Sequence, residues 1–168
     1  MKTSVFIWLL LITKAGFSQL HPHHELETAK YAGVYSYGEN PNTGATGSVT
    51  IYPETDSTVL FFIDICKGPP SYNLGQCYAR LKFKNGNGIY YTKDDYEKKG
   101  CMWDLTINNK LLIIKTLDGC HECGFGAGVI ADNQYALRKD SIPAFFKNGE
   151  GTKVFFSKTS PDSYRGEH

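Results

Sequence analysis

The chain has 168 residues, of which 14% are aromatic, and its 18 basic and 17 acidic residues give a formal net charge of +1. This length suits a single domain with a hydrophobic core and is short for two domains. A near-neutral chain lacks the basic face that nucleic acid requires, so we do not expect a nucleic-acid partner.

The N-terminal segment is typical of a secretory signal peptide. Lys2 precedes an apolar run over 5–12 and the small residues Gly16 and Ser18, so we expect cleavage after Ser18. The apolar run is too short to span a bilayer, and no later segment reaches the roughly 20 apolar residues that a transmembrane helix needs. We therefore expect residues 19–168 to form one secreted or periplasmic domain.

The rest of the chain consists of short alternating or β-branched runs separated by glycine and asparagine. The run 58–65 carries large apolar residues on both faces, so we expect a strand buried on both sides. The run 77–84 alternates apolar and polar residues, as in an antiparallel strand with one face in water. Asn108 and Asn109 separate two runs, and both tolerate the positive φ of a tight hairpin turn. The other expected strands cover 31–37, 48–52, 88–92, 101–107, 110–116, 134–138 and 152–157.

Eight or nine short strands with a turn signal about every ten residues indicate an all-β fold. We predict an antiparallel barrel of about eight strands, because closure removes exposed edges, with a β-sandwich as the alternative. A single helical turn is expected only over 142–146. The segments 20–29 and from 159 onward are expected to be loose ends.

Five cysteines follow the predicted signal peptide, and this odd number leaves one thiol without a partner. Cys66 and Cys77 flank a turn-rich connection, and we predict a disulfide between them. Cys101 begins an expected strand, and its partner is Cys123 or Cys120. Cys123 is preferred because it precedes a glycine-rich loop that the disulfide would anchor, which would leave Cys120 as the free thiol.

Two loops are the expected binding elements. The segment 68–75 is stiffened by two prolines, and a preordered loop loses less entropy on binding. Tyr72 at its tip offers a rigid aromatic contact, although its ring could instead fold back over the mouth of the barrel. The second loop, 124–128, follows Cys123. The residues expected to contact a partner are Pro70, Tyr72, Asn73, Gly124, Phe125 and Gly126.

Metal, redox and catalytic sites are weaker interpretations of the sequence. His21, His23 and His24 follow the cleavage point and lack a four-ligand set, so we expect surface histidines without a metal. Cys120-His-Glu-Cys123 resembles half of a zinc site or a thioredoxin-type dithiol, but no second pair has matching spacing and no helix follows Cys123. Positioned acid-base partners are not evident either, so we predict no catalytic residue and no cofactor.

Four short motifs occur in order along the chain. They are Tyr31-Ala-Gly-Val-Tyr35, Gly68-Pro-Pro-Ser-Tyr-Asn-Leu-Gly75, Cys123-Gly-Phe-Gly-Ala-Gly-Val129 and Ala131-Asp-Asn-Gln-Tyr135. Together they resemble a loosely defined group of small exported bacterial β-barrel proteins of unknown role, which carry a Cys-Gly-Phe-Gly stretch and an Asp-Gly-x-Tyr stretch. Asn133 stands here in the place of that glycine. Small disulfide-bonded barrels of this size also distantly resemble periplasmic lysozyme inhibitors, but their serine-glycine recognition motifs are not evident in this chain.

These observations predict an exported, non-enzymatic and monomeric binding protein. It would act through surface loops, as a binding protein or an inhibitor, on a protein or glycan at the cell envelope. A lipocalin-like carrier is the alternative, and it would need an internal cavity of roughly 300 Å³ or more. The bulky residues Phe61, Phe83, Trp103 and Leu105 favour a filled interior instead. A metal-binding or redox protein is a third interpretation.

Overall fold

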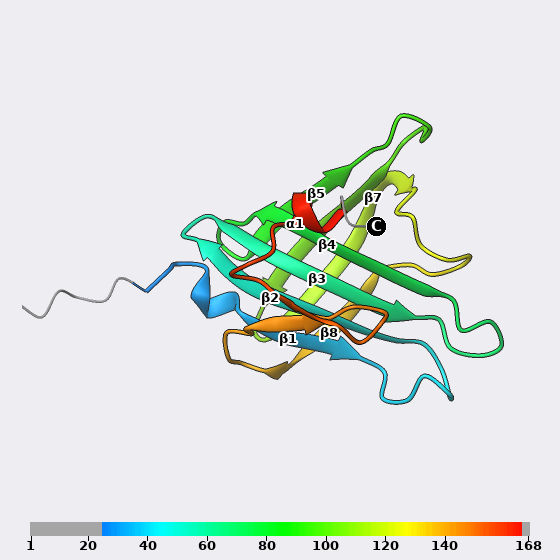
Figure 1. The fold of residues 1–168 in the computed structure, drawn as a ribbon, viewed down its shortest axis with the longest axis horizontal. Helices are drawn as coiled ribbons and strands as arrows, with labels where there is room; N and C mark the ends of the chain where they lie inside the picture. The colour runs from blue at the N-terminus through cyan, green and yellow to red at the C-terminus, as the bar shows by residue number, and fades with distance from the viewer. Residues whose placement is uncertain (1–24, 166–168) are drawn as a thin grey trace, which may run out of the picture.

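The computed structural model describes residues 25–165, which form mainly β-strands (Figure 1). The predicted signal peptide (1–18) and the three N-terminal histidines lie outside the described residues. The 3-10 turn η1 (Ala29–Tyr31) comes first and the helix α1 (Pro161–Arg165) comes last. Within this described part, neither helix is long or apolar enough to cross a bilayer. The strands are β1 (Gly33–Tyr37), β2 (Thr46–Thr55), β3 (Thr58–Cys66), β4 (Leu74–Lys82), β5 (Asn87–Thr92), β6 (Cys101–Asn108), β7 (Leu111–His121), β8 (Asn133–Lys139), β9 (Phe145–Lys147) and β10 (Lys153–Phe155).

The first eight strands form an antiparallel sheet that is nearly closed into a barrel, as predicted. Consecutive strands pair from β1 to β4 and from β5 to β8, and β8 returns to pair with β1. β4 and β5 stand at the two ends of the strand order. They are joined by a tight turn in which Lys84 and Asn87 exchange two backbone hydrogen bonds of 2.9 and 3.0 Å. The barrel therefore has one seam, between β4 and β5, and this turn joins the two strands at one end of the seam.

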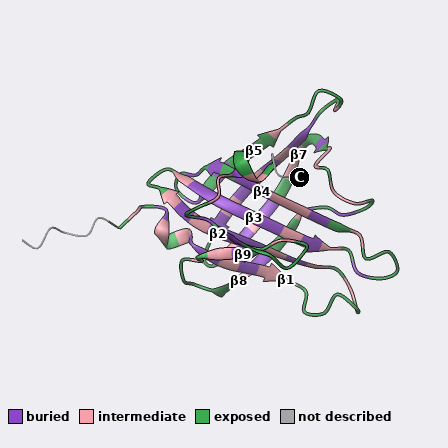
Figure 2. Cartoon of the chain, in the orientation of Figure 1, coloured by how far each residue is buried: buried purple, intermediate pink, exposed green. Residues whose placement is uncertain are grey.

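The interior of the barrel is filled by large side chains. The rings of Phe61, Tyr90 and Trp103 contact one another, with centroids 5.2 to 6.4 Å apart. Along the strands in Figure 2, buried residues alternate with more exposed ones, as the pleat of a sheet requires. The largest fully buried side chains are Trp103, Tyr35, Tyr135, Phe61, Phe83, Ile51, Ile63, Ile65, Leu81, Leu105, Leu112 and Ile114.

β3 is buried on both faces, as its sequence predicts. Phe61 belongs to the interior cluster, whereas Leu60 and Phe62 belong to a second cluster on the outer face. This second cluster is covered by the hairpin β9–β10, drawn in orange in Figure 1, and Phe146 of β9 stacks on Phe62 with ring centroids 3.9 Å apart. The apolar residues on the outer face of β3 are thus kept from water by the hairpin that packs on them.

The structure corrects several expected boundaries. The prediction of a helical turn over 142–146 is wrong. The end of this segment belongs to β9, which pairs with β10 and places Phe146 against the outer face of β3. The strand expected over 152–157 shortens to β10 and joins this small sheet instead of the barrel. The strands expected over 48–52 and 77–84 become β2 and β4, with the bounds given above.

The tail from residue 159 contains a short helix where we expected a loose end. Its start has the usual signals, since the Ser160 hydroxyl accepts a 3.1 Å hydrogen bond from the Ser163 N–H, Pro161 is the first helical residue and Asp162 lies in the first turn. The Tyr164 ring then packs edge-on against Tyr78 of β4, with centroids 5.6 Å apart. This contact holds α1 against the seam side of the barrel.

Candidate functional site

The two ends of the barrel differ in the length of their connections. At one end the strands are joined through the short segments 56–57, 83–86 and 109–110. The turn 109–110 has positive φ at Asn109 and Lys110, one residue later than the expected Asn108–Asn109 pair. At the other end four longer loops emerge on the right of Figure 1, and we call them together the loop face: 38–45, 67–73, 93–100 and 122–132.

The loop 67–73 is ordered by its own backbone. The Lys67 N–H donates to the Asn73 carbonyl and the Tyr72 N–H donates to the Gly68 carbonyl, both at 2.9 Å. Tyr72 has a φ of 50°, in the left-handed region. Its side chain is 46% exposed, so the ring does not fold back over the barrel mouth. Pro70 is exposed beside it.

The two loops expected to bind a partner lie side by side, although about fifty residues separate them in sequence. The Asn73 Nδ2 donates to the Ala127 carbonyl at 2.7 Å, and the Gly126 N–H donates to the Leu74 carbonyl at 2.9 Å. Phe125 packs inward, with its ring centroid 5.6 Å from that of Trp103. Phe125 is therefore a support for the two loops, whereas we had expected it to be a contact residue.

The tight approach of Phe125 to β4 depends on Gly75. A Cβ added at this buried glycine would lie 2.5 Å from a carbon of the Phe125 ring, so the ring would have to move. We expect Gly75→Ala to lower the free energy of unfolding by about 2 kcal/mol, measured by urea titration. Gly44→Ala is the matched control in the same loop face, because a Cβ there meets no atom within 4 Å.

The Phe125→Ala background tests the cause of this loss. Without the ring, Gly75→Ala should cost less than about 0.5 kcal/mol, since the clash is gone. An equal cost in both backgrounds would contradict the contact between the two loops.

The loop 122–132 is anchored at both of its ends. Cys123 forms a disulfide with Cys101, as predicted. At the far end, Asp132 accepts hydrogen bonds from the Thr116 N–H, at 2.9 Å, and from the Thr116 hydroxyl. The role of Asp132 is not evident from the sequence, because its partner Thr116 lies on β7, 16 residues earlier in the chain.

Glu122 ties the same loop to the loop 93–100. Its carboxylate accepts hydrogen bonds from the backbone N–H groups of Lys99, at 2.5 Å, and Gly100, at 2.8 Å. These hydrogen bonds lower the pKa of the Glu122 carboxyl below its usual value. On the other side, Gly68 lies against the backbone of Gly44, so all four loops are in contact in series.

The predicted disulfide between Cys66 and Cys77 is wrong, because both cysteines are free. In the register of β3 and β4, Cys77 lies opposite Ile63 and Cys66 lies opposite Leu74. Ile63 points into the barrel, and strand alternation turns Cys66, three residues later, to the other face. The two thiols therefore lie on opposite faces of the sheet.

Two of the free cysteines, Cys77 and Cys120, are poorly placed for redox chemistry. Cys120 is free, as predicted. It is also buried, so we do not expect its thiol to be reactive, although its lack of a disulfide partner alone would suggest this. Cys77 donates a 3.5 Å hydrogen bond to the Tyr90 hydroxyl across the seam, and burial raises the pKa of its thiol. A raised thiol pKa disfavours the reactive thiolate. Cys120 therefore lacks the exposure of a redox cysteine, and Cys77 lacks the low thiol pKa.

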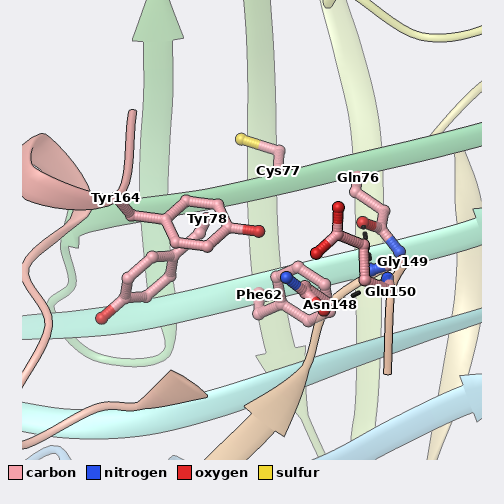
Figure 3. Close-up of a pocket in the computed structure, with 8 residues that line it drawn as sticks. All are labelled: Phe62, Gln76, Cys77, Tyr78, Asn148, Gly149, Glu150 and Tyr164. Atoms are coloured by element: carbon pink, nitrogen blue, oxygen red, sulfur yellow. Dashed lines mark hydrogen bonds between the residues drawn. The ribbon is translucent and has the colours of Figure 1, made fainter. Parts of the chain in front are cut away.

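A pocket of about 320 Å³ lies beside Cys77, between the turn of the β9–β10 hairpin, β4 and Tyr164 of α1 (Figure 3). Its amides are engaged within the chain. Gln76 donates to Asp64 at 3.0 Å and accepts from the Gly149 N–H at 3.1 Å. Asn148 accepts from the backbone N–H groups of the hairpin turn. The bond from Gly149 to Gln76 holds the hairpin turn on β4, and the bonds to Asn148 order the turn itself. We interpret the pocket as part of this joint between the hairpin and the barrel.

Among the described residues, the remaining candidates for a metal or catalytic site do not lie together. His121 is exposed at the end of β7. Within residues 25–165, no cluster of three or more histidine, cysteine or acidic side chains is arranged to hold a metal ion. Comparison of the chain with protein-family models, with curated proteins and with solved structures gives no match.

Proposed function

We propose that this is an exported, non-enzymatic binding protein whose loop face recognises the surface of a partner protein. The observation that carries the proposal is the pairing of the loops 67–73 and 122–132 through the hydrogen bonds of Asn73 and Gly126. A surface whose loops are already ordered loses little conformational entropy when it binds.

The exposed apolar side chains of the loop face support a protein partner. Tyr72, Tyr96 and Ile130, together with Leu74 at the adjoining start of β4, are between 46% and 85% exposed. These four are half of the eight large apolar side chains exposed in the described residues. Aromatic and large aliphatic side chains on an ordered surface are typical anchors of protein interfaces. A glycan at the cell envelope remains the alternative partner.

A lipocalin-like carrier has less support. Its ligand would have to replace the rings of Phe61, Tyr90 and Trp103, which fill the barrel interior. A hollow of about 780 Å³ lies outside this interior, at the end of the barrel opposite the loop face, between η1, the turn 109–110 and β8. A dithiol redox protein has less support still, since Cys123 is bonded to Cys101 while Cys120 is buried.

Tyr72 is the residue on which the proposal is best tested. Affinity capture from native secretions with the purified protein would identify the partner. We then expect Tyr72→Ala to weaken binding by about 2 kcal/mol in a titration, because truncation of an exposed aromatic anchor removes a hot spot. Folding should be unchanged, since Tyr72 lies at a loop tip.

Ile142→Ala is the matched control, because Ile142 is a large apolar side chain that is 55% exposed and follows β8 at the end of the barrel opposite the loop face. It should bind normally, and so should a variant in which His21, His23 and His24 are all alanine. Normal binding by the Tyr72 variant would contradict the loop-face proposal. Lost binding by the histidine variant would favour a metal-dependent function instead.

A further inference from the structure

The outer face of the β9–β10 hairpin combines two phenylalanines with three lysines. The inner residues of the hairpin, Phe146 and Val154, pack against the barrel. Their neighbours along the strands therefore point away from it. This surface, together with Lys158 in the turn that follows β10, is called the hairpin patch: Phe145, Lys147, Lys153, Phe155 and Lys158.

The two rings and two of the ammonium groups form one cluster. The ring centroids of Phe145 and Phe155 are 5.6 Å apart. The Lys153 Nζ lies 4.5 Å from the Phe145 centroid, and the Lys158 Nζ lies 5.3 Å from the Phe155 centroid. Phe155 is nevertheless 39% exposed. The patch thus presents apolar area and positive charge together.

The positive charge of the patch is not balanced by nearby carboxylates of its own segment. Glu150 is the sole acidic residue between 144 and 160 in the sequence. It lines the pocket on the inner side of the hairpin in Figure 3. The ion pairs found within residues 25–165 involve Lys30, Arg80 and Lys110, and none of the lysines of the patch.

We propose that the hairpin patch docks the protein onto an anionic lipid bilayer. Lysines near such a surface are attracted by the negative potential of the headgroups. Exposed phenylalanine side chains gain free energy when they enter the boundary between headgroups and acyl chains. The patch supplies both interactions on one face, and the loop face is built from other segments, so this inference does not depend on the proposed function.

The packing of the rings favours a bilayer over a nucleic acid or an acidic polysaccharide. Recognition of bases by aromatic residues needs a free ring face for stacking, and a sugar ring stacks in the same way. Here an ammonium group already lies over one face of each ring, and the two rings also pack against each other with centroids 5.6 Å apart. A lipid interface requires only that apolar area be buried, so it does not compete with these contacts.

Vesicle sedimentation with the purified protein tests the proposal. We expect binding to vesicles of phosphatidylglycerol mixed with phosphatidylcholine, and little binding to phosphatidylcholine alone. Lys153→Gln combined with Lys158→Gln should lower the partition coefficient about 30-fold, equal to about 2 kcal/mol for two charges. Phe155→Ala should lower it about tenfold through lost apolar area.

Matched controls test whether the loss of vesicle binding is specific to the patch or follows the removal of any exposed lysines or any exposed ring. Lys84→Gln combined with Lys115→Gln removes the same charge from two exposed positions, on the β4–β5 turn and on β7, and Tyr91→Ala removes an exposed ring from β5. Both should bind like the parent protein. Circular dichroism would verify that each variant is folded.

Three results would overturn the proposal. The first is parental binding by both patch variants, and the second is an equal loss in the controls. The third is capture by heparin or single-stranded DNA without vesicle binding, which would assign the patch to an anionic polymer.

Discussion

Replacing Trp103 by alanine is expected to lower the free energy of unfolding by about 4 kcal/mol. Trp103 is only 1% exposed, and its ring contacts Phe61, Tyr90 and Phe125. Its removal takes away buried apolar contacts and leaves a cavity that the curved sheet cannot fully close. Equilibrium unfolding in guanidinium chloride, followed by circular dichroism, measures the loss.

The Trp103→Phe variant is the control for this result. Phenylalanine keeps an aromatic ring in the barrel, so we expect a loss of about 1 to 2 kcal/mol. If Trp103→Ala instead cost less than about 1 kcal/mol, the interior would not be tightly packed. The carrier interpretation would then gain support over the loop-face proposal.

Removing the disulfide with Cys101→Ala and Cys123→Ala is expected to lower the free energy of unfolding by about 3 kcal/mol. The bridge joins residues 22 apart, and closing a loop of that length restricts the unfolded chain by about this amount. The loop 122–132 should also lose its anchor, so amide hydrogen exchange in this loop should accelerate. Unfolding titrations and exchange measurements together check both effects.

Cys66→Ala is the matched control, because Cys66 is a free thiol on the outer face of β3. We expect it to cost about 1 kcal/mol or less. A loss as large as that of the double variant would instead indicate the bridge between Cys66 and Cys77 that the sequence suggested. Non-reducing peptide mapping would distinguish the two cases directly.

The sequence carried most of the information about the individual strands. The clean alternation after Cys77 and the doubly apolar run around Phe61 report which side chains are buried, because strand geometry turns successive residues to opposite faces. Repeated short strands then favour a closed antiparallel sheet, which the structure confirms. Tyr72 also stood out locally, because it sits beside two prolines in a short loop.

The missed features all depend on partners that are distant in the sequence. Sequence spacing suggested a bridge from Cys66 to Cys77, but the register of β3 and β4 put the two thiols on opposite faces. The local sequence around Phe146 resembles a helical turn. In the structure this segment is a strand, because it pairs with β10 and Phe146 stacks on Phe62. In both cases the pairing between strands overrode the local pattern.

The sequence by itself determined the eight strands of the barrel, their buried faces and the loops that could carry contacts. Only the tertiary structure decided which loops meet, since the bond from Asn73 to Ala127 joins residues 54 apart. It also decided that Phe125 faces Trp103 and that the hairpin exposes Phe155. The physical reason is that periodicity records the side on which a residue lies, whereas the neighbour across the sheet follows from register and packing.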